Sequence, residues 1–311
     1  MDLVQTALGL LLLTLGGDIL VRGAVGVSLR LGVSVMVISL TVVAFGTSLP
    51  ELLVAVQSAL HGAPAIGIGN VIGSNIANVL LVLGLPAALA PLLLDDGQPQ
   101  RSLTIMIAVS LVFVALAYTQ PLHWWQGTIL LGLFVWALWE NYTTARSDRK
   151  ARAGLETGVD ELSLGWIPLL IMLVGGLAIL PVGADLLVEG ARGLARAAGV
   201  SEAVIGVTVV AIGTSLPELA TTVAAALRRQ AEVAIGNVIG SCVFNLALIM
   251  GVMAWFGPIP IDGHFFRFDL WAMLIAAAAL VPVVLWGRRM GRRHGLAFLA
   301  VYAGYVWLAL S

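Results

Sequence analysis

The chain has 311 residues, of which 60% are hydrophobic and only 11% are charged, and its mean hydropathy is +1.02. Soluble domains carry about 25% charged residues, so this composition excludes an ordinary soluble protein and predicts an all-α protein that crosses a membrane many times. The formal net charge of −1 gives no indication of a nucleic-acid partner. The single cysteine, Cys242, excludes an internal disulfide and any metal site built from several thiolates.

Apolar segments long enough to cross a bilayer occur in two sets of five. The first set covers roughly 3–25, 33–60, 66–92, 102–119 and 122–140. The second set covers roughly 164–187, 200–227, 233–257, 269–287 and 295–310. We therefore expect ten transmembrane helices in three parts: a first half at 1–140, a polar cytoplasmic linker at 141–163 and a second half at 164–311.

The two halves share two sequence blocks. Thr41–Leu52 and Thr208–Leu219 are identical at eleven of twelve positions, and Ile68–Ser74 and Ile235–Ser241 both read I-G-N-V-I-G-S. In each case the second copy follows 167 residues after the first. Because a unit of five spans leaves the membrane on the side opposite to its entry, the second half is expected to be inverted. Such inverted repeats are typical of transporters whose site lies at the repeat interface near the middle of the membrane.

The basic residues indicate the orientation of the chain. If the N-terminus lies outside, thirteen of the sixteen arginines and lysines fall on the inner side, and only Arg192, Arg196 and Arg267 fall on the outer side. Cytoplasmic loops are enriched in basic residues, so both termini are expected outside the cytoplasm. The expected location is the inner or plasma membrane of a prokaryote.

Proline and glycine predict breaks in two of the spans. Pro50 lacks a backbone donor, clashes with the preceding turn and disfavours helix at the residue before it, and Gly46 loosens the same turn. Gly213 and Pro217 repeat this arrangement in the second half. Spans 2 and 7 are therefore predicted to be broken helices at the core of the protein, with exposed carbonyls and helix ends that can bind ions.

Each repeated block places a polar face on its span. Spacings of i, i+3, i+4 and i+7 align two sets on spans 2 and 7: Ala44, Thr47, Ser48 and Glu51, and Ala211, Thr214, Ser215 and Glu218. Spacings of i, i+4 and i+8 align two further sets on spans 3 and 8: Asn70, Ser74 and Asn78, and Asn237, Ser241 and Asn245. Converging by pseudo-symmetry, these faces would form a pocket of oxygen ligands with two negative charges, which suits a hard cation such as Ca²⁺.

Structural interpretations compete with functional ones at several positions. A carboxylate within a span is costly, so the repeated pair Glu51 and Glu218 predicts function. The pairs Gly69–Gly73 and Gly236–Gly240 are more typical of helix packing than of phosphate binding. Asn70 and Asn237 could ligate an ion or could only bridge helices, and Asp18 and Asp185 are expected to have a structural or interfacial role.

The two repeated blocks resemble the α-repeats of the sodium/calcium exchanger family, within the calcium:cation antiporter superfamily. The resemblance covers the whole chain and is greatest to the short prokaryotic members, which lack a large calcium-sensing loop. It implies ion ligation by Thr47, Ser48, Glu51, Ser74 and Asn78, by Thr214, Ser215, Glu218, Ser241 and Asn245, and by the backbone carbonyls of Ala44 and Ala211. Potassium-dependent members carry an acid where this chain has Asn245, so the resemblance does not favour potassium co-transport.

These features predict a secondary antiporter that exchanges Ca²⁺ for Na⁺ by alternating access, with no enzymatic activity and no cofactor. Its expected partners are the bilayer and metal cations, without an obligate protein partner. A Ca²⁺/H⁺ exchanger with the same fold remains an alternative, because carboxylates accept either counter-ion. A passive channel and an intramembrane hydrolase are weaker alternatives. Inverted halves suit alternating access, and no histidine recurs in the repeat to activate Ser48 or Ser215.

Overall fold

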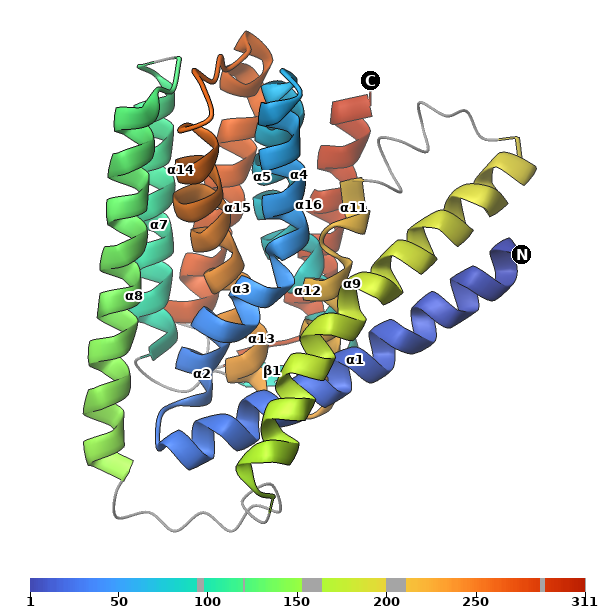
Figure 1. The fold of residues 1–311 in the computed structure, drawn as a ribbon, viewed down its shortest axis with the longest axis vertical. Helices are drawn as coiled ribbons and strands as arrows, with labels where there is room; N and C mark the ends of the chain where they lie inside the picture. Colours follow the sequence, from blue (N-terminus) through green and yellow to red (C-terminus); the bar gives the residue numbers. More distant parts are fainter. Residues whose placement is uncertain (94–97, 120, 153–163, 200–210, 286–288, 311) are drawn as a thin grey trace.

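The computed structural model describes residues 1–93, 98–119, 121–152, 164–199, 211–285 and 289–310. This part of the chain is almost entirely helical (Figure 1). The helical elements of its first portion are α1 (Asp2–Leu31), α2 (Val35–Ile38), the π-helical turn η1 (Ser39–Val43), α3 (Ala44–Thr47), α4 (Leu49–Leu60), α5 (Pro64–Ala77), the π-helical turn η2 (Asn78–Val82), α6 (Gly84–Leu89), α7 (Gln98–Ala117) and α8 (Trp124–Arg152).

The second portion begins with one long helix and ends with two further long helices. Its elements are α9 (Trp166–Ala197), α11 (Ala211–Gly213), α12 (Leu216–Leu227), α13 (Ala231–Val243), the π-helical turn η5 (Phe244–Ile249), α14 (Met250–Met253), the π-helical turn η6 (Phe265–Asp269), α15 (Leu270–Leu285) and α16 (Arg292–Leu310). Two antiparallel strands of two residues each, β1 (Leu92–Leu93) and β2 (Arg289–Met290), are the strands of the described residues.

Length and hydropathy identify the spans within the described part. Six continuous helical segments there are long and apolar enough to cross a membrane, and the bent pair α2–α3 and α4 would make a seventh. The expectation of a polytopic helical membrane protein is therefore confirmed at this level, and the count of ten spans stays a prediction. The residues from 141 onward, expected to form a linker, continue α8 as far as Arg152.

The predicted break in span 2 is confirmed. The helix bends by 45° between Thr47 and Leu49, at Ser48, whose φ of −87° and ψ of 7° depart from helical values. Pro50 follows in the first turn of α4, where its missing donor costs nothing because that donor would be unpaired. Ser215 has nearly the same backbone angles, −87° and 5°, and precedes α12 in the same way. The segment that leads into α11 lies outside the described residues.

Helix α13 lies at the centre of the molecule. The apolar window of Ala231–Met253 is 94% buried, the highest share among the candidate spans of the described part. Glycine makes this central packing possible, because a Cβ atom on Gly240 would lie 2.6 Å from the Cβ of Ala44 and 2.7 Å from the oxygen of Leu40. The packing interpretation of the Gly236–Gly240 pair is confirmed, since a Cβ on Gly236 would also lie 2.9 Å from the Cβ of Ser39.

Two long helices differ in direction from the rest of the bundle. Helices α1 and α9 lie side by side and are steeply inclined to the other helices (Figure 1). Their backbones approach closely at glycines: a Cβ on Gly176 would lie 2.7 Å from that of Leu20, and a Cβ on Gly183 would lie 3.0 Å from that of Leu12. The pair therefore forms a tightly joined unit against the broken helices.

Candidate cation-binding site

The breaks in the helices bring the repeated polar residues to helix ends. Thr47 ends α3, Ser48 forms the bend, and Glu51 lies in the first turn of α4. In the second half Thr214 and Ser215 lie between α11 and α12, and Glu218 lies in the first turn of α12. A carboxylate is stabilised in the first helical turn by the unpaired N–H groups and the positive end of the helix dipole.

The two glutamates are both buried inside the protein. Each side chain has 0% exposure. Ser48 Oγ donates to Oε1 of Glu218 at 3.0 Å, and Ser241 Oγ lies 3.4 Å from the same oxygen. The two repeated blocks of the sequence therefore contribute to one buried site, with Ser48 reaching across to the carboxylate of the other half.

The other carboxylate has a different environment. Thr214 and Ser215 occupy the positions of the second half that correspond to Thr47 and Ser48. No described residue, however, forms a hydrogen bond of good geometry with either oxygen of Glu51, and the same is true of Glu218 Oε2 and Ser215 Oγ. Buried polar atoms are normally paired because an unpaired one is costly, so a concentration of unpaired oxygens indicates a site that binds something.

Two amides extend the same site. Asn78 and Asn245 each have 0% exposure, and within the described part neither the oxygen nor the nitrogen of either side chain has a hydrogen-bond partner. Both lie in π-helical turns, Asn78 at the start of η2 and Asn245 in η5. A π-turn re-aims side chains relative to the preceding helix and is frequent at functional sites. These turns were not predicted, and no residue pattern in the two segments indicates them.

Asn70 and Asn237 bridge helices, which was one of the two interpretations left open by the sequence. Thr47 Oγ1 donates to Asn237 Oδ1 at 3.1 Å, and Thr214 Oγ1 donates to Asn70 Oδ1 at 3.2 Å. Asn237 Nδ2 in turn donates to Thr222 Oγ1 at 3.3 Å. Thr47 Oγ1 also lies 3.3 Å from the carbonyl oxygen of Ala44, so its proton has two acceptors within the protein. With either acceptor, the lone pairs of the threonine oxygens are left available to a cation.

The remaining predicted residues lie along the same elements. Ala44 and Ser74 are buried, and the carbonyl of Ala44 accepts the N–H of Ser48 at 3.0 Å. Ala211 begins α11, the short helix that precedes Thr214. Direct hydrogen bonds thus join Ser48 and Ser241 to Glu218.

The atoms of this site that could ligate a cation are oxygens, and its asparagine side chains are neutral amides. Among the described residues, no group of three or more histidine, cysteine, aspartate or glutamate side chains could hold a metal ion. The arrangement therefore relies on two carboxylates supplemented by hydroxyl, amide and carbonyl oxygens, a chemistry that suits hard cations and not transition metals.

Access to the site is different on its two flanks. A cavity of about 610 Å³ separates α4 from α9 and reaches Thr214. Its lining residues are Pro50, Leu53, Val54, Gln57, Pro181, Ala184, Asp185, Val188, Glu189, Arg192, Gly213, Thr214 and Pro217. On the other flank α1 packs directly on α12, where a Cβ on Gly17 would lie 2.8 Å from the oxygen of Ala220. There Asp18 forms an ion pair with Arg228, which gives it the structural role that the sequence analysis expected.

Comparison with known proteins identifies the family. The model of the family described as sodium/calcium exchanger protein matches residues 1–142 and 168–311. Inner membrane protein YrbG of Escherichia coli is 34% identical over 99% of this chain and 97% of its own length. Sodium/calcium exchanger MaX1 of Methanosarcina acetivorans is 31% identical over 96% of this chain and 95% of its own length.

The fold is also shared with a solved structure. The sodium-calcium exchanger NCX_Mj, soaked with Na⁺ and Sr²⁺, superposes with a TM-score of 0.83 at 33% identity, over 98% of this chain and 97% of that chain. Family and fold are those of a transporter, and the apolar helices make the chain an integral membrane protein. The chain belongs to the sodium/calcium exchanger family of cation antiporters.

Proposed function

We propose that this protein exchanges Ca²⁺ for Na⁺ across the membrane, with alternating access to one site between Glu51 and Glu218. The observation that carries the proposal is the buried carboxylate pair, surrounded by oxygens that lack protein partners. The relative MaX1, whose name describes a sodium/calcium exchanger, supports the choice of ions.

The charge of the pair supplies the coupling. With both glutamates ionised, an empty site carries a charge of about −2 in a low-dielectric barrier, and its passage from one side to the other is strongly unfavourable. One Ca²⁺ or several Na⁺ neutralise the pair and allow access to change sides. Since either load excludes the other, exchange follows without a separate energy-coupling domain. With three Na⁺ per Ca²⁺, each cycle moves one net charge, worth about 2.3 kcal/mol per 100 mV.

The proposed ligands lie on the broken helices and on the helices that carry the asparagines. They are Ala44, Thr47, Ser48, Glu51, Ser74, Asn78, Ala211, Thr214, Ser215, Glu218, Ser241 and Asn245. Asn245 is neutral, so the two glutamates are the anionic members of this set. A site with two anionic ligands is fully neutralised by one Ca²⁺, which is the condition for an electrically neutral loaded state.

The proposed architecture is two inverted halves of five spans, 1–140 and 164–311, joined by a linker at 141–163. Three observations support it. The family model matches two segments and leaves 143–167 between them. Ser48 and Ser215 share one backbone conformation before equivalent helices. Leu92 pairs with Met290 and Leu122 pairs with Ile259, and Leu92 and Ile259 occupy equivalent positions of the two halves.

A Ca²⁺/H⁺ exchanger is the second candidate, because the same two carboxylates can be neutralised by protons. The two functions separate in sealed vesicles loaded with purified protein, under a Na⁺ gradient or a pH gradient imposed alone. We expect an outward Na⁺ gradient to drive Ca²⁺ uptake and a pH gradient without Na⁺ to drive none. Uptake under the pH gradient alone would assign the protein to Ca²⁺/H⁺ exchange, and uptake under neither gradient would reject both candidates.

The proposed orientation makes a separate prediction. A reporter enzyme fused after Ser311 should behave as extracytoplasmic, and one inserted near Ser147 should behave as cytoplasmic, because thirteen of sixteen basic residues lie on the side of Ser147. Paired alkaline phosphatase and green fluorescent protein fusions at each position measure this. The reverse pattern would invert the orientation without affecting the site.

A further inference from the structure

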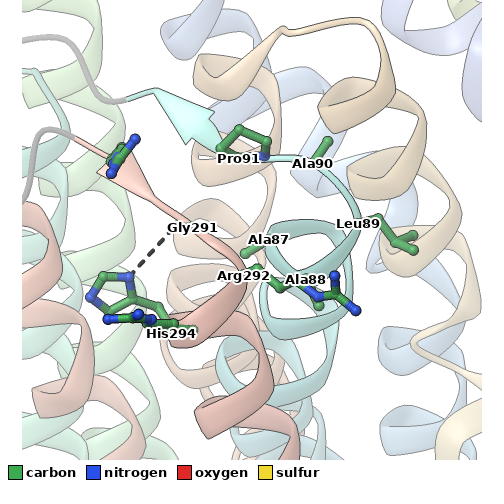
Figure 2. A pocket seen from close by; sticks show the side chains of 10 residues that line it. Ala87, Ala88, Leu89, Ala90, Pro91, Gly291, Arg292 and His294 are labelled. Atoms are coloured by element: carbon green, nitrogen blue, oxygen red, sulfur yellow. Dashed lines mark hydrogen bonds between the residues drawn. The ribbon is translucent and has the colours of Figure 1, made fainter.

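A second cavity lies away from the glutamates, where the C-terminal end of α6 meets the N-terminal end of α16. Its volume is about 640 Å³. Figure 2 shows its lining side chains on the last turn of α6 and the loop after it, on the segment through Gly291 and on the first turn of α16. We refer to it as the basic hollow, defined by Ala87, Ala88, Leu89, Ala90, Pro91, Arg289, Gly291, Arg292, Arg293 and His294.

The basic hollow is lined by three arginines. Arg289, Arg292 and Arg293 line it, and none of them forms an ion pair with an acidic side chain of the described residues. From Leu270 to the last residue the sequence contains no aspartate or glutamate. Asp95 and Asp96, the acidic residues that follow Pro91 most closely in the sequence, lie outside the described residues.

The walls of the hollow are held in place by backbone contacts. A Cβ on Gly295 would lie 2.5 Å from the oxygen of Gly84, so α16 and α6 touch backbone to backbone. Arg289 is paired with Leu93 between β2 and β1. The N–H of Gly291 donates to Nδ1 of His294 at 3.4 Å, as the dashed line in Figure 2 marks. The arginines therefore extend from a fixed frame and not from a free loop.

The opposite end of the molecule shows that this frame does not require arginine. There the bridge between Leu122 and Ile259 ties the loops in the same manner. Its flanking residues are aromatic, with Trp124 and Trp255 in edge contact at 6.1 Å between ring centroids. Residues 121–126 contain no arginine. The basic lining is thus a property of one end only, added to a framework that forms without it.

We propose that the basic hollow binds a phosphate group, carried by the headgroup of an anionic phospholipid or by a free phosphate ion. Guanidinium groups bind phosphate oxygens in a bidentate manner, and the N–H groups of the first turn of α16 add a favourable field for an anion. The volume lies within the range of small-ligand pockets. In the proposed orientation the hollow lies at the cytoplasmic membrane surface, where basic pockets between helices meet anionic headgroups.

The test measures binding and does not depend on ion exchange. The full-length protein, purified in a neutral detergent and stripped of lipid, is titrated separately with dioctanoyl-phosphatidylglycerol, inorganic phosphate and dioctanoyl-phosphatidylcholine, and complexes are counted by native mass spectrometry. We expect wild type to retain phosphatidylglycerol or phosphate, which identifies the source, and the triple variant R289Q/R292Q/R293Q to lose at least about ten-fold in affinity.

Two controls keep the result specific. The variant R146Q/R149Q/R152Q removes the same charge from the end of α8, which contributes no lining residue to the hollow, and should bind like wild type. The variant R292K/R293K keeps the charge but loses the bidentate geometry, so it should bind more weakly than wild type even if the triple variant does not fold. Equal binding by wild type and R292K/R293K, equal loss in both glutamine triples, or equal retention of phosphatidylcholine would overturn the proposal.

Discussion

Replacing Glu51 or Glu218 by glutamine should lower Ca²⁺ flux by about 100-fold or more while leaving the protein folded. The affinity of oxygen sites for Ca²⁺ varies over orders of magnitude with the number of charged ligands, and each variant removes one of two. Glutamine has the shape of glutamate, and its carbonyl oxygen can still accept from Ser48 and Ser241 at position 218. Uptake of ⁴⁵Ca²⁺ by proteoliposomes under an imposed Na⁺ gradient measures the effect.

The unfolding temperatures of the same variants show whether they are folded. A fully buried carboxylate opposes folding when no cation is bound to it, so each variant should unfold at a temperature equal to or above that of wild type without divalent cations. Glu140→Gln is the matched control, because Glu140 pairs with Arg101 away from the site. Its flux should equal that of wild type. Wild-type flux in either site variant would contradict the proposal that Glu51 and Glu218 bind the transported cation.

Gly240→Ala should raise the Ca²⁺ concentration for half-maximal flux by about ten-fold or more. The added Cβ would lie 2.6 Å from the Cβ of Ala44 and 2.7 Å from the oxygen of Leu40, both on the broken helix that carries Thr47 and Glu51. Overpacking of this kind costs about 1–3 kcal/mol and is relieved by shifting the backbone. Since the nearest atoms belong to the segment that enters the bend, the shift displaces the ligands themselves.

The control for this substitution is Gly132→Ala on α8, where an added Cβ meets no atom of the described residues within 4 Å. Alanine is the better helix former, so this variant should be at least as stable as wild type and should transport normally. Ca²⁺-dependent flux and thermal unfolding measured on both variants separate a local displacement from general destabilisation. An unchanged Ca²⁺ dependence in Gly240→Ala would show that α13 tolerates a methyl group there without moving Ala44.

The bend at Ser48 and the contact between the two repeated blocks could be predicted from the sequence. Proline and glycine at fixed spacing break a helix wherever it lies, and the repeat relates one carboxylate to the other without further information. The π-helical turns at Asn78 and Asn245 could not be predicted in this way. An extra residue in a helical turn is stabilised by tertiary contacts, and neither segment carries a residue that requires it.

Contacts between distant segments also could not be predicted from the periodicity of the sequence. The bonds from Thr47 to Asn237 and from Thr214 to Asn70 show that both asparagines bridge helices, and both bonds span more than 140 residues. The continuation of α8 to Arg152 was missed for another reason. Polar composition suggested a linker, whereas alanine, arginine and lysine are good helix formers that need no apolar surface to extend an existing helix.

The ion pair between Asp18 and Arg228 bears on how the population would divide between the two access states of the proposed exchange cycle. Its side chains are 39% and 33% exposed, and pairs so accessible to solvent contribute no more than about 1 kcal/mol, a factor of about five in an equilibrium. If the halves are inverted copies, the equivalent positions for the opposite state are Asp185 and His61. Arginine offers a planar fork of donors that matches a carboxylate, whereas an imidazole cannot make the same forked contact. The two proposed states are therefore not energetic mirror images, and this pair favours the one in which α1 rests on α12.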